Sequence, residues 1–277
     1  MATYVVSDIH GYAGALDRVL GLASPGAGDL VCVLGDMVDR GPDPLGVVRI
    51  VRSLPSCRVL MGNHERIMLD TLASGDAADM LGWERNGGST TLAGLSGLTD
   101  EAYGELLEWV ERLPLFDTVS VGGRVHILVH AGIDAPALRA ALAELGYDGA
   151  AGYGDVPEGV LRAALALQSP ETLLWTRGPF WEEPTGLIGP DGRGPRVISG
   201  HTPSVLLGRY ASRAVGPVLD GDERALMVEV GACYDSFGVA DCIDIDASAA
   251  AGAPFGQVGI MRLDDLRCWY APVGEDT

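Results

Sequence analysis

Lysine is absent from this sequence of 277 residues, so all 19 of its basic residues are arginines. The absence excludes mechanisms that use a lysine nucleophile or a lysine Schiff base. The base composition of the source genome is a sufficient explanation for the bias. Even so, the cationic contacts to an anionic substrate must come from arginine, whose planar guanidinium can grip two phosphate oxygens at once.

Positive charge is scarce as a whole. The chain has 38 acidic residues against 19 basic ones, which gives a formal net charge of -19. Such an excess disfavours attraction to the phosphates of nucleic acid and to anionic lipid. We therefore expect neither a nucleic-acid partner nor a membrane partner.

Cysteines are few and scattered, and signals for export or membrane insertion are missing. The five cysteines form no C-x-x-C pair, so neither a zinc knuckle nor a disulfide framework is indicated. The first residues lack the basic and apolar regions of a signal peptide, and no apolar run approaches the ~20 residues of a membrane helix. These absences favour a soluble, cytoplasmic protein.

Hydrophobic residues make up 47% of the chain and charged residues 21%, as in a globular protein. The length suits one large α/β domain. Short apolar runs alternate with segments of helical spacing, which favours a parallel or mixed sheet with ligands at the carboxyl ends of its strands. Predicted strands cover residues 4–6, 30–34, 59–61, 125–129, 196–199, 225–230, 241–245, 258–263 and 268–270, and predicted helices cover 13–22, 44–54, 66–72, 101–113, 135–145 and 157–167.

Five segments share one design, in which an apolar strand delivers an oxygen or imidazole ligand as the backbone turns. Each segment alone would be an ordinary turn, but all five together indicate a metal site. The mixture of carboxylate, amide and imidazole suits Mn²⁺, Fe or Zn²⁺ better than Ca²⁺. Two such ions can share a carboxylate and a bridging hydroxide that attacks phosphorus. The candidate residues are Asp8, His10, Asp36, Asn63, His64, His130 and His201.

One histidine, His126, stands apart from this set. It lies in the middle of a predicted strand and not at its end. We interpret it as a structural histidine.

The same segments closely resemble the phosphoprotein-phosphatase branch of the calcineurin-like metallophosphoesterases, in its bacterial form. The motifs are SDIHG at 7–11, GDMVDRG at 35–41, GNHE at 62–65, HAG at 130–132 and SGHT at 199–202. Their order and spacing match over about residues 1–246. The resemblance implies a four-layer αββα sandwich of two mixed sheets with a small helical cap, and ligands at strand ends between the sheets.

The resemblance also implies roles. One metal would be held by Asp8, His10 and a bridging Asp36, and the other by Asp36 together with Asn63, His130 and His201. His64 would protonate the leaving-group oxygen, and Asp39 would orient and charge it. An imidazole beside a carboxylate has its protonated form favoured, which independently suits it to act as a general acid.

Two arginines and one asparagine are candidates for binding the substrate phosphate. Arg40 follows Asp39 directly, and Arg177 ends a Leu-Leu-Trp-Thr-Arg segment similar to one that supplies a second arginine in the family. A surface arginine after a buried strand is the alternative for Arg177. Asn86 opens an Asn-Gly-Gly loop similar to one in bacterial members, although a plain turn explains it nearly as well.

Two departures from the family pattern stand out. Met61 replaces a usual arginine, a change shared by bacterial relatives. Residues 205–241 form an insertion between the last histidine motif and an Ile-Asp element, and it is either a specificity element or an inert surface segment. We expect a single domain over residues 1–277, with cap or insert segments at about 134–195 and 205–241.

The expected function is metal-dependent hydrolysis of phosphomonoesters, on a phosphoserine or phosphothreonine protein or on a small molecule. The expected cofactors are two divalent ions, with Mn²⁺ ahead of Fe or Zn²⁺. A symmetric dinucleoside tetraphosphate hydrolase is the alternative. A silent phosphate-binding module is disfavoured because no ligand is lost, nor His64, nor Asp39.

Overall fold

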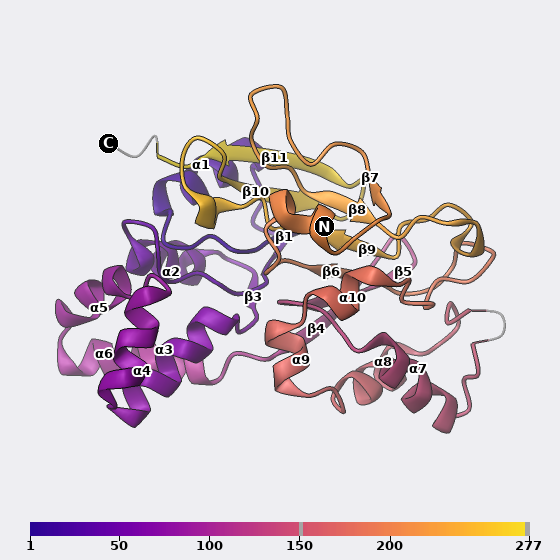
Figure 1. The fold of residues 1–277 in the computed structure, drawn as a ribbon, viewed down its shortest axis with the longest axis horizontal. Helices are drawn as coiled ribbons and strands as arrows, with labels where there is room; N and C mark the ends of the chain where they lie inside the picture. Colours follow the sequence, from indigo (N-terminus) through magenta and orange to yellow (C-terminus); the bar gives the residue numbers. More distant parts are fainter. Residues whose placement is uncertain (150–151, 275–277) are drawn as a thin grey trace.

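The computed structural model describes residues 1–149 and 152–274. Two mixed β-sheets lie face to face, and helices cover their outer faces (Figure 1). The strand order is β11-β10-β1-β2-β3 in the first sheet and β4-β5-β6-β9-β8-β7 in the second. The predicted four-layer sandwich is confirmed.

The first sheet has a parallel centre and an antiparallel edge. Its strands β1, β2 and β3 run parallel, as the alternating βα pattern predicts, and the C-terminal hairpin pairs with β1 in the opposite direction. The bounds are β1 (Thr3–Val6), β2 (Leu30–Val33), β3 (Cys57–Val59), β10 (Gln257–Arg262) and β11 (Arg267–Pro272).

The second sheet also combines both directions. Strands β5, β6 and β9 are parallel neighbours, so their carboxyl ends lie side by side. Strands β4, β8 and β7 are antiparallel additions. The bounds are β4 (Phe116–Val121), β5 (Arg124–Val129), β6 (Arg196–Ser199), β7 (Ala214–Val215), β8 (Val228–Val230) and β9 (Cys242–Asp244).

Strand side chains alternate between two hydrophobic layers. On β1, Val5 packs into the layer between the sheets with Leu128 and Ile198 of the second sheet. Its neighbours Tyr4 and Val6 face the outer helices instead. Because both faces of the central strands are buried, a strand such as β2 is a nearly continuous apolar run and not an alternation of polar and apolar residues.

Helices of the first half cover the first sheet and build a small cluster beside it. Two of them were not predicted, α4 and α5, because their apolar positions show little helical spacing. None of the helices in the described part of the chain is long and apolar enough to cross a membrane. The bounds are α1 (Ala13–Ala23), α2 (Pro44–Ser53), α3 (Asn63–Ser74), α4 (Ala77–Arg85), α5 (Ser89–Ser96) and α6 (Asp100–Glu111).

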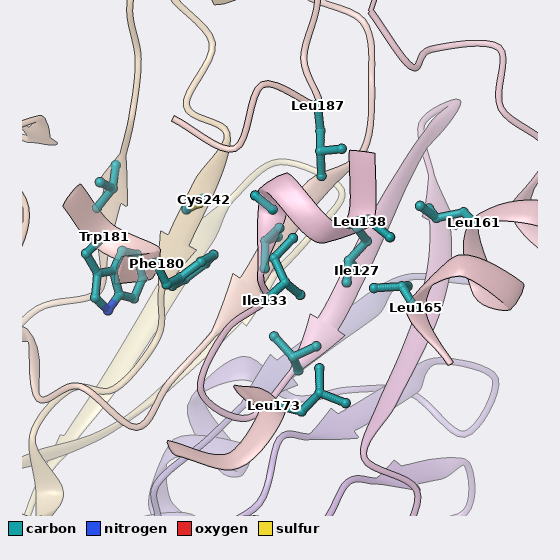
Figure 2. Packing of buried hydrophobic residues seen from close by; sticks show 14 of the residues in the cluster. Ile127, Ile133, Leu138, Leu161, Leu165, Leu173, Phe180, Trp181, Leu187 and Cys242 are labelled. Carbon is teal, nitrogen blue, oxygen red and sulfur yellow. The ribbon is translucent and has the colours of Figure 1, made fainter. Parts of the chain in front are cut away.

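Helices α7 to α10 form the helical layer on the outer face of the second sheet. Ile127 of β5 packs against Leu138, Leu165 and Phe180 in one buried cluster (Figure 2). These helices therefore share a core with the sheet. The bounds are α7 (Ala135–Glu144), α8 (Glu158–Leu165), α9 (Pro170–Trp175) and α10 (Gly178–Glu182).

The insertion at 205–241 contributes the short helix η1 (Ser204–Arg209), strands β7 and β8, and the turn η2 (Tyr234–Ser236). Strand β8 pairs with β9, so the insertion extends the second sheet at its edge. Leu207 and Tyr210 anchor it to the same core as α10. Part of the insertion, strands β7 and β8, thus belongs to the sandwich.

A strand that the sequence analysis missed, β4, forms a hairpin with β5. The turn between them is Gly122-Gly123, with φ of +57° and +81°. A tight two-residue turn of this kind needs positive φ at both positions, which glycine adopts without strain. The missed strand, with the sequence FDTVSV, mixes polar and apolar residues and lacks the continuous apolar run that predicts a buried strand.

Candidate metal centre

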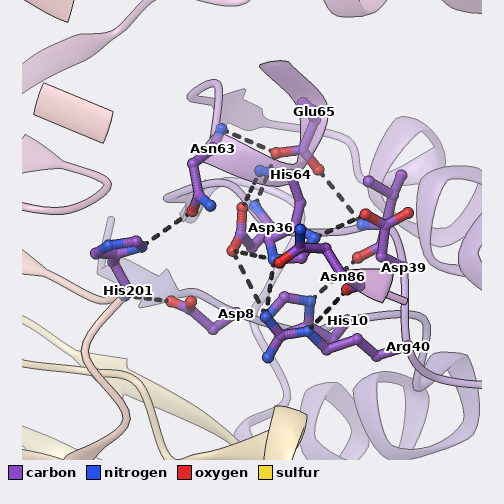
Figure 3. A network of polar contacts seen from close by, with 12 residues as sticks. Asp8, His10, Asp36, Asp39, Arg40, Asn63, His64, Glu65, Asn86 and His201 are labelled. Carbon is purple, nitrogen blue, oxygen red and sulfur yellow. Dashed lines mark hydrogen bonds and ion pairs between the residues drawn. The ribbon is translucent and has the colours of Figure 1, made fainter. Parts of the chain in front are cut away.

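The loops after five strands meet between the two sheets and carry all six predicted metal ligands (Figure 3). The first sheet supplies four of them and the second sheet two. Every one of these side chains is buried. They are Asp8 and His10 after β1, Asp36 after β2, Asn63 after β3, His130 after β5 and His201 after β6.

The backbone is strained at this meeting point. Left-handed φ angles occur at Asp8 (+53°), His10 (+48°), Asp36 (+54°) and His201 (+66°). Such conformations cost about 1–3 kcal/mol each outside glycine and persist only where the surroundings enforce them. The strain turns each side chain out of its strand direction and toward the common centre.

Two glycines let the turns approach each other. A Cβ atom on Gly35, whose φ is +88°, would lie 2.4 Å from the backbone nitrogen of Gly62. One on Gly62 would lie 2.2 Å from Oδ1 of Asp36. The Gly-Asp and Gly-Asn-His motifs therefore interlock through space that only glycine leaves open.

Glu65 fixes the same two turns, a role that the sequence analysis did not assign. Its carboxylate is fully buried and accepts hydrogen bonds at 2.8 Å from the backbone N–H groups of Asp36, Met37 and Gly62. The available signal was its place three residues after a helix N-cap, where a glutamate caps the backbone. Glu65 thus ties the loop after β2 to the start of α3.

Hydrogen bonds to backbone carbonyls determine the tautomers of two histidines. His10 uses Nδ1 to donate to the carbonyl of Val38 at 3.1 Å, and His130 uses Nδ1 to donate to that of Leu34 at 2.8 Å. A carbonyl can only accept, so in each neutral ring Nε2 carries the lone pair. Both lone pairs face the centre, as metal ligation requires.

Oxygen and nitrogen atoms that can bind a metal ion converge from both sheets. Oδ1 of Asn63 lies 2.8 Å from Nε2 of His130 and 2.9 Å from Nδ1 of His201. The two oxygens of Asp36 lie 3.5 Å from Nε2 of His10 and 3.5 Å from Nε2 of His130. Acceptor atoms gathered in this way repel one another unless cations lie among them, so the donor set fits divalent metals.

These contacts divide into two groups that have Asp36 in common. One group contains His10, Asp36 and His64, and the other contains Asp36, His130 and His201. His64 is a poor ligand because both of its ring nitrogens are already engaged, by Asp39 and Arg40. Asp36 is therefore the residue placed to serve two ions.

Burial disfavours the protonated forms of His10 and His201. It lowers the pKa of His10 well below the usual value, assisted by the positive charges of His64 and Arg40. Burial, then the charge of His130, lowers the pKa of His201 to about 2. Burial raises the pKa of the Asp36 carboxyl well above its usual range, and the charge of Asp8 adds to this. A site of neutral imidazoles and crowded carboxylates gains from bound cations.

His64 and Asp39 form a buried dyad beside the shared carboxylate. Nδ1 of His64 lies 2.7 Å from Oδ2 of Asp39, and the same carboxylate accepts from Nε1 of Trp83 at 3.0 Å and from Oγ1 of Thr91 at 2.6 Å. Burial alone would lower the pKa of His64. The charge of Asp36 and the hydrogen bond to Asp39 outweigh burial, so the pKa is raised.

Both predicted arginines line the cavity above this centre, which encloses about 270 Å³. Nη2 of Arg40 lies 2.9 Å from Nε2 of His64. Nη2 of Arg177 donates to the carbonyl of His201 at 3.3 Å. The segment before Arg177 is the helix α9 and not the buried strand of the alternative interpretation.

Asn86 also lines the cavity, but its contacts are partly structural. Its side-chain amide donates to the carbonyl of Gly82 at 2.9 Å. Its own carbonyl accepts from Nε of Arg40 at 3.4 Å, and the next residue, Gly87, accepts from the Arg40 backbone N–H at 2.9 Å. The Asn86 loop thus holds Arg40 in place.

Asp246 and Trp175 are among the lining residues of the cavity that the sequence analysis did not assign to the site. Asp246 follows β9 and is buried, and burial, then the charge of Asp8, raises the pKa of its carboxyl well above the usual range. Trp175 ends α9. The signal for Asp246 was its position after a strand parallel to β6, a pairing that the sequence did not reveal.

The fold and the centre together define an α/β protein with a candidate binuclear metal site of carboxylates, imidazoles and an amide. The chain belongs to the calcineurin-like phosphoesterase family, whose model matches residues 1–223. The family predicted from the motifs is confirmed.

Curated relatives share about half of the chain. A symmetrical bis(5'-nucleosyl)-tetraphosphatase from Acidovorax sp. strain JS42 is 38% identical over 136 residues, which cover 48% of this chain and 44% of the relative. One from Dechloromonas aromatica is 35% identical over 135 residues, with 48% and 44% covered. The chain thus matches less than half the length of these relatives.

Solved structures support the fold across the whole chain. A protein assigned provisionally as a diadenosine tetraphosphatase aligns with a TM-score of 0.55 at 18% identity, over 99% of this chain and 94% of its own. A protein serine/threonine phosphatase from Saccharomyces cerevisiae aligns with a TM-score of 0.54 at 13% identity, over 100% and 81%. At such identities the likeness concerns the fold alone.

Proposed function

We propose that the protein hydrolyses dinucleoside tetraphosphates symmetrically, at a centre of two divalent ions. The observation that carries the phosphoesterase chemistry is the dyad of His64 and Asp39 set against the shared carboxylate Asp36. The names of the curated relatives support the substrate. They favour the dinucleoside substrate, which the sequence analysis placed second, over phosphomonoesters.

The residues that would hold the ions follow from the two groups around Asp36. We assign Asp8, His10 and Asp36 to one ion, and Asp36, Asn63, His130 and His201 to the other. Bound there, two divalent ions would polarise the phosphoryl oxygens and supply a nucleophile derived from water. We keep Mn²⁺ as the first candidate, since carboxylate, amide and imidazole together suit it.

His64 would deliver a proton to the leaving oxygen from Nε2. Its Nδ1–H is held by Asp39, whose other partners, Trp83 and Thr91, keep the carboxylate in one orientation. This arrangement fixes both the tautomer and the direction of the ring. The charge of Asp36 and the hydrogen bond to Asp39 raise the pKa of His64 and so favour its protonated form.

Arg40 and Arg177 would bind the phosphate oxygens from two sides of the cavity. Arg40 now donates to Nε2 of His64, the same atom that must carry the proton. Arginine has no acceptor, so Arg40 must leave Nε2 before the acid can be loaded. A phosphate oxygen offers the guanidinium a stronger, charged acceptor. Substrate binding would thereby free His64 for its role.

The domain organisation stays a prediction: one domain over 1–277, with the segments 134–195 and 205–241 as cap or insert. The first segment contributes two residues to the cavity, Trp175 at the end of α9 and Arg177 just before α10. We therefore propose that this segment shapes the substrate site.

A substrate panel with and without metal tests the proposal. The purified chain, loaded with Mn²⁺, is given a dinucleoside tetraphosphate, a phosphothreonine peptide and a nucleoside monophosphate, before and after chelation. We expect the highest kcat/KM for the dinucleoside tetraphosphate, two nucleoside diphosphates as products, and loss of activity on chelation. Asp36→Asn, purified in parallel, controls for contaminating phosphatases. A higher kcat/KM for the phosphothreonine peptide or the nucleoside monophosphate than for the dinucleoside tetraphosphate would show that the protein is a phosphomonoesterase instead.

A further inference from the structure

Trp175 connects the catalytic cavity to a second hollow. The side chain lines the cavity that contains the metal centre and also a groove between α3 and α9. It is 37% exposed, although it ends a helix whose preceding residues, Leu173 and Leu174, are buried. Its ring centroid lies 6.2 Å from that of His201, with the planes at 85°. One indole thus borders both the reacting centre and open space.

The groove beside Trp175 differs in character from the cavity. Its apolar lining includes Ile67, Pro170 and Leu174, and its volume is about 560 Å³, within the range of ~300–1,000 Å³ of small-molecule sites. Its polar residues include the ion pair of Arg66 with Asp70, which is 2.9 Å long. An apolar floor with hydrogen-bonding groups at its side suits a nucleoside, which has a flat base and a hydroxylated sugar.

Trp175 is the largest stacking surface among the described lining residues of the cavity. Among its described lining residues, Trp175 is the only tryptophan, tyrosine or phenylalanine, and the others are mainly charged or imidazole side chains. Arg177, the candidate phosphate ligand, lies two residues further along the chain. A phosphate between Arg177 and the metal centre would therefore place its attached nucleoside near the indole.

We propose that Trp175 is the stacking platform for one nucleobase of the substrate and that the groove between α3 and α9 holds the attached nucleoside. This inference rests on the proposed function and assigns a specificity residue within it. Stacking of a base on an aromatic side chain contributes ~1–3 kcal/mol by alanine substitution, a factor of about 5 to 150 in affinity. Base identity is read weakly by such a contact, so several nucleosides fit.

The test compares two ligands that differ by a nucleoside, ADP and inorganic pyrophosphate. Their dissociation constants are measured by calorimetry on the Mn²⁺-loaded wild type and on Trp175→Ala, Trp175→Phe and Leu167→Ala. Leu167 is 74% exposed and lines none of these hollows, so it controls for the loss of a surface side chain from the same region. We expect Trp175→Ala to weaken ADP about 5- to 150-fold and to leave pyrophosphate unchanged. Trp175→Phe should restore most of the ADP affinity.

Two outcomes would overturn the inference. An equal loss for ADP and pyrophosphate would mean that the indole only supports His201, which it contacts. No loss for ADP would mean that the base binds elsewhere. Failure of the proposed function looks different, since the wild type would then not cleave dinucleoside tetraphosphate at all. If wild type cleaves it and Trp175→Ala keeps the same kcat/KM, the stacking inference alone is wrong.

Discussion

The two sheets contribute to the metal centre in different ways. The ligands of the first sheet arise within the first 63 residues, on consecutive βα units, and Glu65 ties two of their loops together through backbone hydrogen bonds. The ligands of the second sheet, His130 and His201, are brought together by the parallel pairing of β5 with β6. Strands that follow one another closely in the sequence thus organise one half of the centre, and strands far apart in the sequence organise the other.

Side-chain contacts across the gap join the halves. Asn63 of the first half faces both histidines of the second half, and Asp36 faces His10 on one side and His130 on the other. The proposed general acid belongs wholly to the first half, since His64, Asp39 and Arg40 all precede β4. A substitution can therefore remove the proton donor without changing the ligands of the second sheet.

The largest effect should come from Asp36→Asn, because Asp36 alone belongs to both ligand groups. Loss of its charge should weaken binding of both ions, and kcat/KM should fall about 1000-fold or more, since metal ions supply several kcal/mol of transition-state stabilisation. Steady-state kinetics and metal analysis check this. Activity near that of wild type would contradict a shared carboxylate.

His64→Ala should remove only the acid of the first half. General acid catalysis contributes ~10²–10⁴-fold, so kcat should fall by about that factor while the metal content persists. Measuring turnover and metal content on the same preparation distinguishes loss of the acid from loss of the metal ions. Loss of metal from this variant would instead make His64 a ligand. A leaving group of low pKa should rescue part of the rate.

Glu65→Gln should loosen the first half without touching its ligands. The buried carboxylate accepts from the backbone N–H groups of Asp36, Met37 and Gly62, and a neutral amide accepts less strongly and brings an unmatched donor. We expect a loss of ~1–3 kcal/mol in the free energy of unfolding, measured by urea titration. Glu111→Gln, on the exposed end of α6, is the control and should change little.

His126 should make the second sheet sensitive to acid. Burial, then the charges of Arg196 and Arg124, lowers its pKa to about 3 in the folded protein. The unfolded chain binds the proton near pH ~6.5 and the folded chain does not, so this contribution is present above that pH and is lost as pH falls toward 3. Between pH 7 and 5 the loss should be about 1–2 kcal/mol.

The same urea titrations on His126→Gln check this prediction. The variant cannot titrate in this range, so its free energy of unfolding should fall less between pH 7 and 5 than that of wild type. Equal slopes in the two proteins would show that the imidazole does not carry the effect. His126, predicted as a structural histidine, lies in the middle of β5 and is buried, away from the centre.

The sequence predicted the first half of the site better than its surroundings. A Gly-Asp or Gly-Asn-His motif at the end of a strand predicts a metal ligand, because the residues that form the turn and the residue that would bind the metal lie in the same short motif. The partners of Asp39, Trp83 and Thr91, could not be predicted, since they reach it from other helices. Asp246 and Trp175 were missed for the same reason, as only the folded chain places them at the cavity.

The metal content of the wild-type chain tests the account most directly. The protein is loaded with Mn²⁺, freed of excess ion by gel filtration and analysed by elemental mass spectrometry together with its activity. Two ligand groups that share Asp36 predict about two ions per chain, both removed by chelation together with activity. A single ion per chain at full activity would contradict the central claim that the two sheets each contribute one half of a binuclear centre.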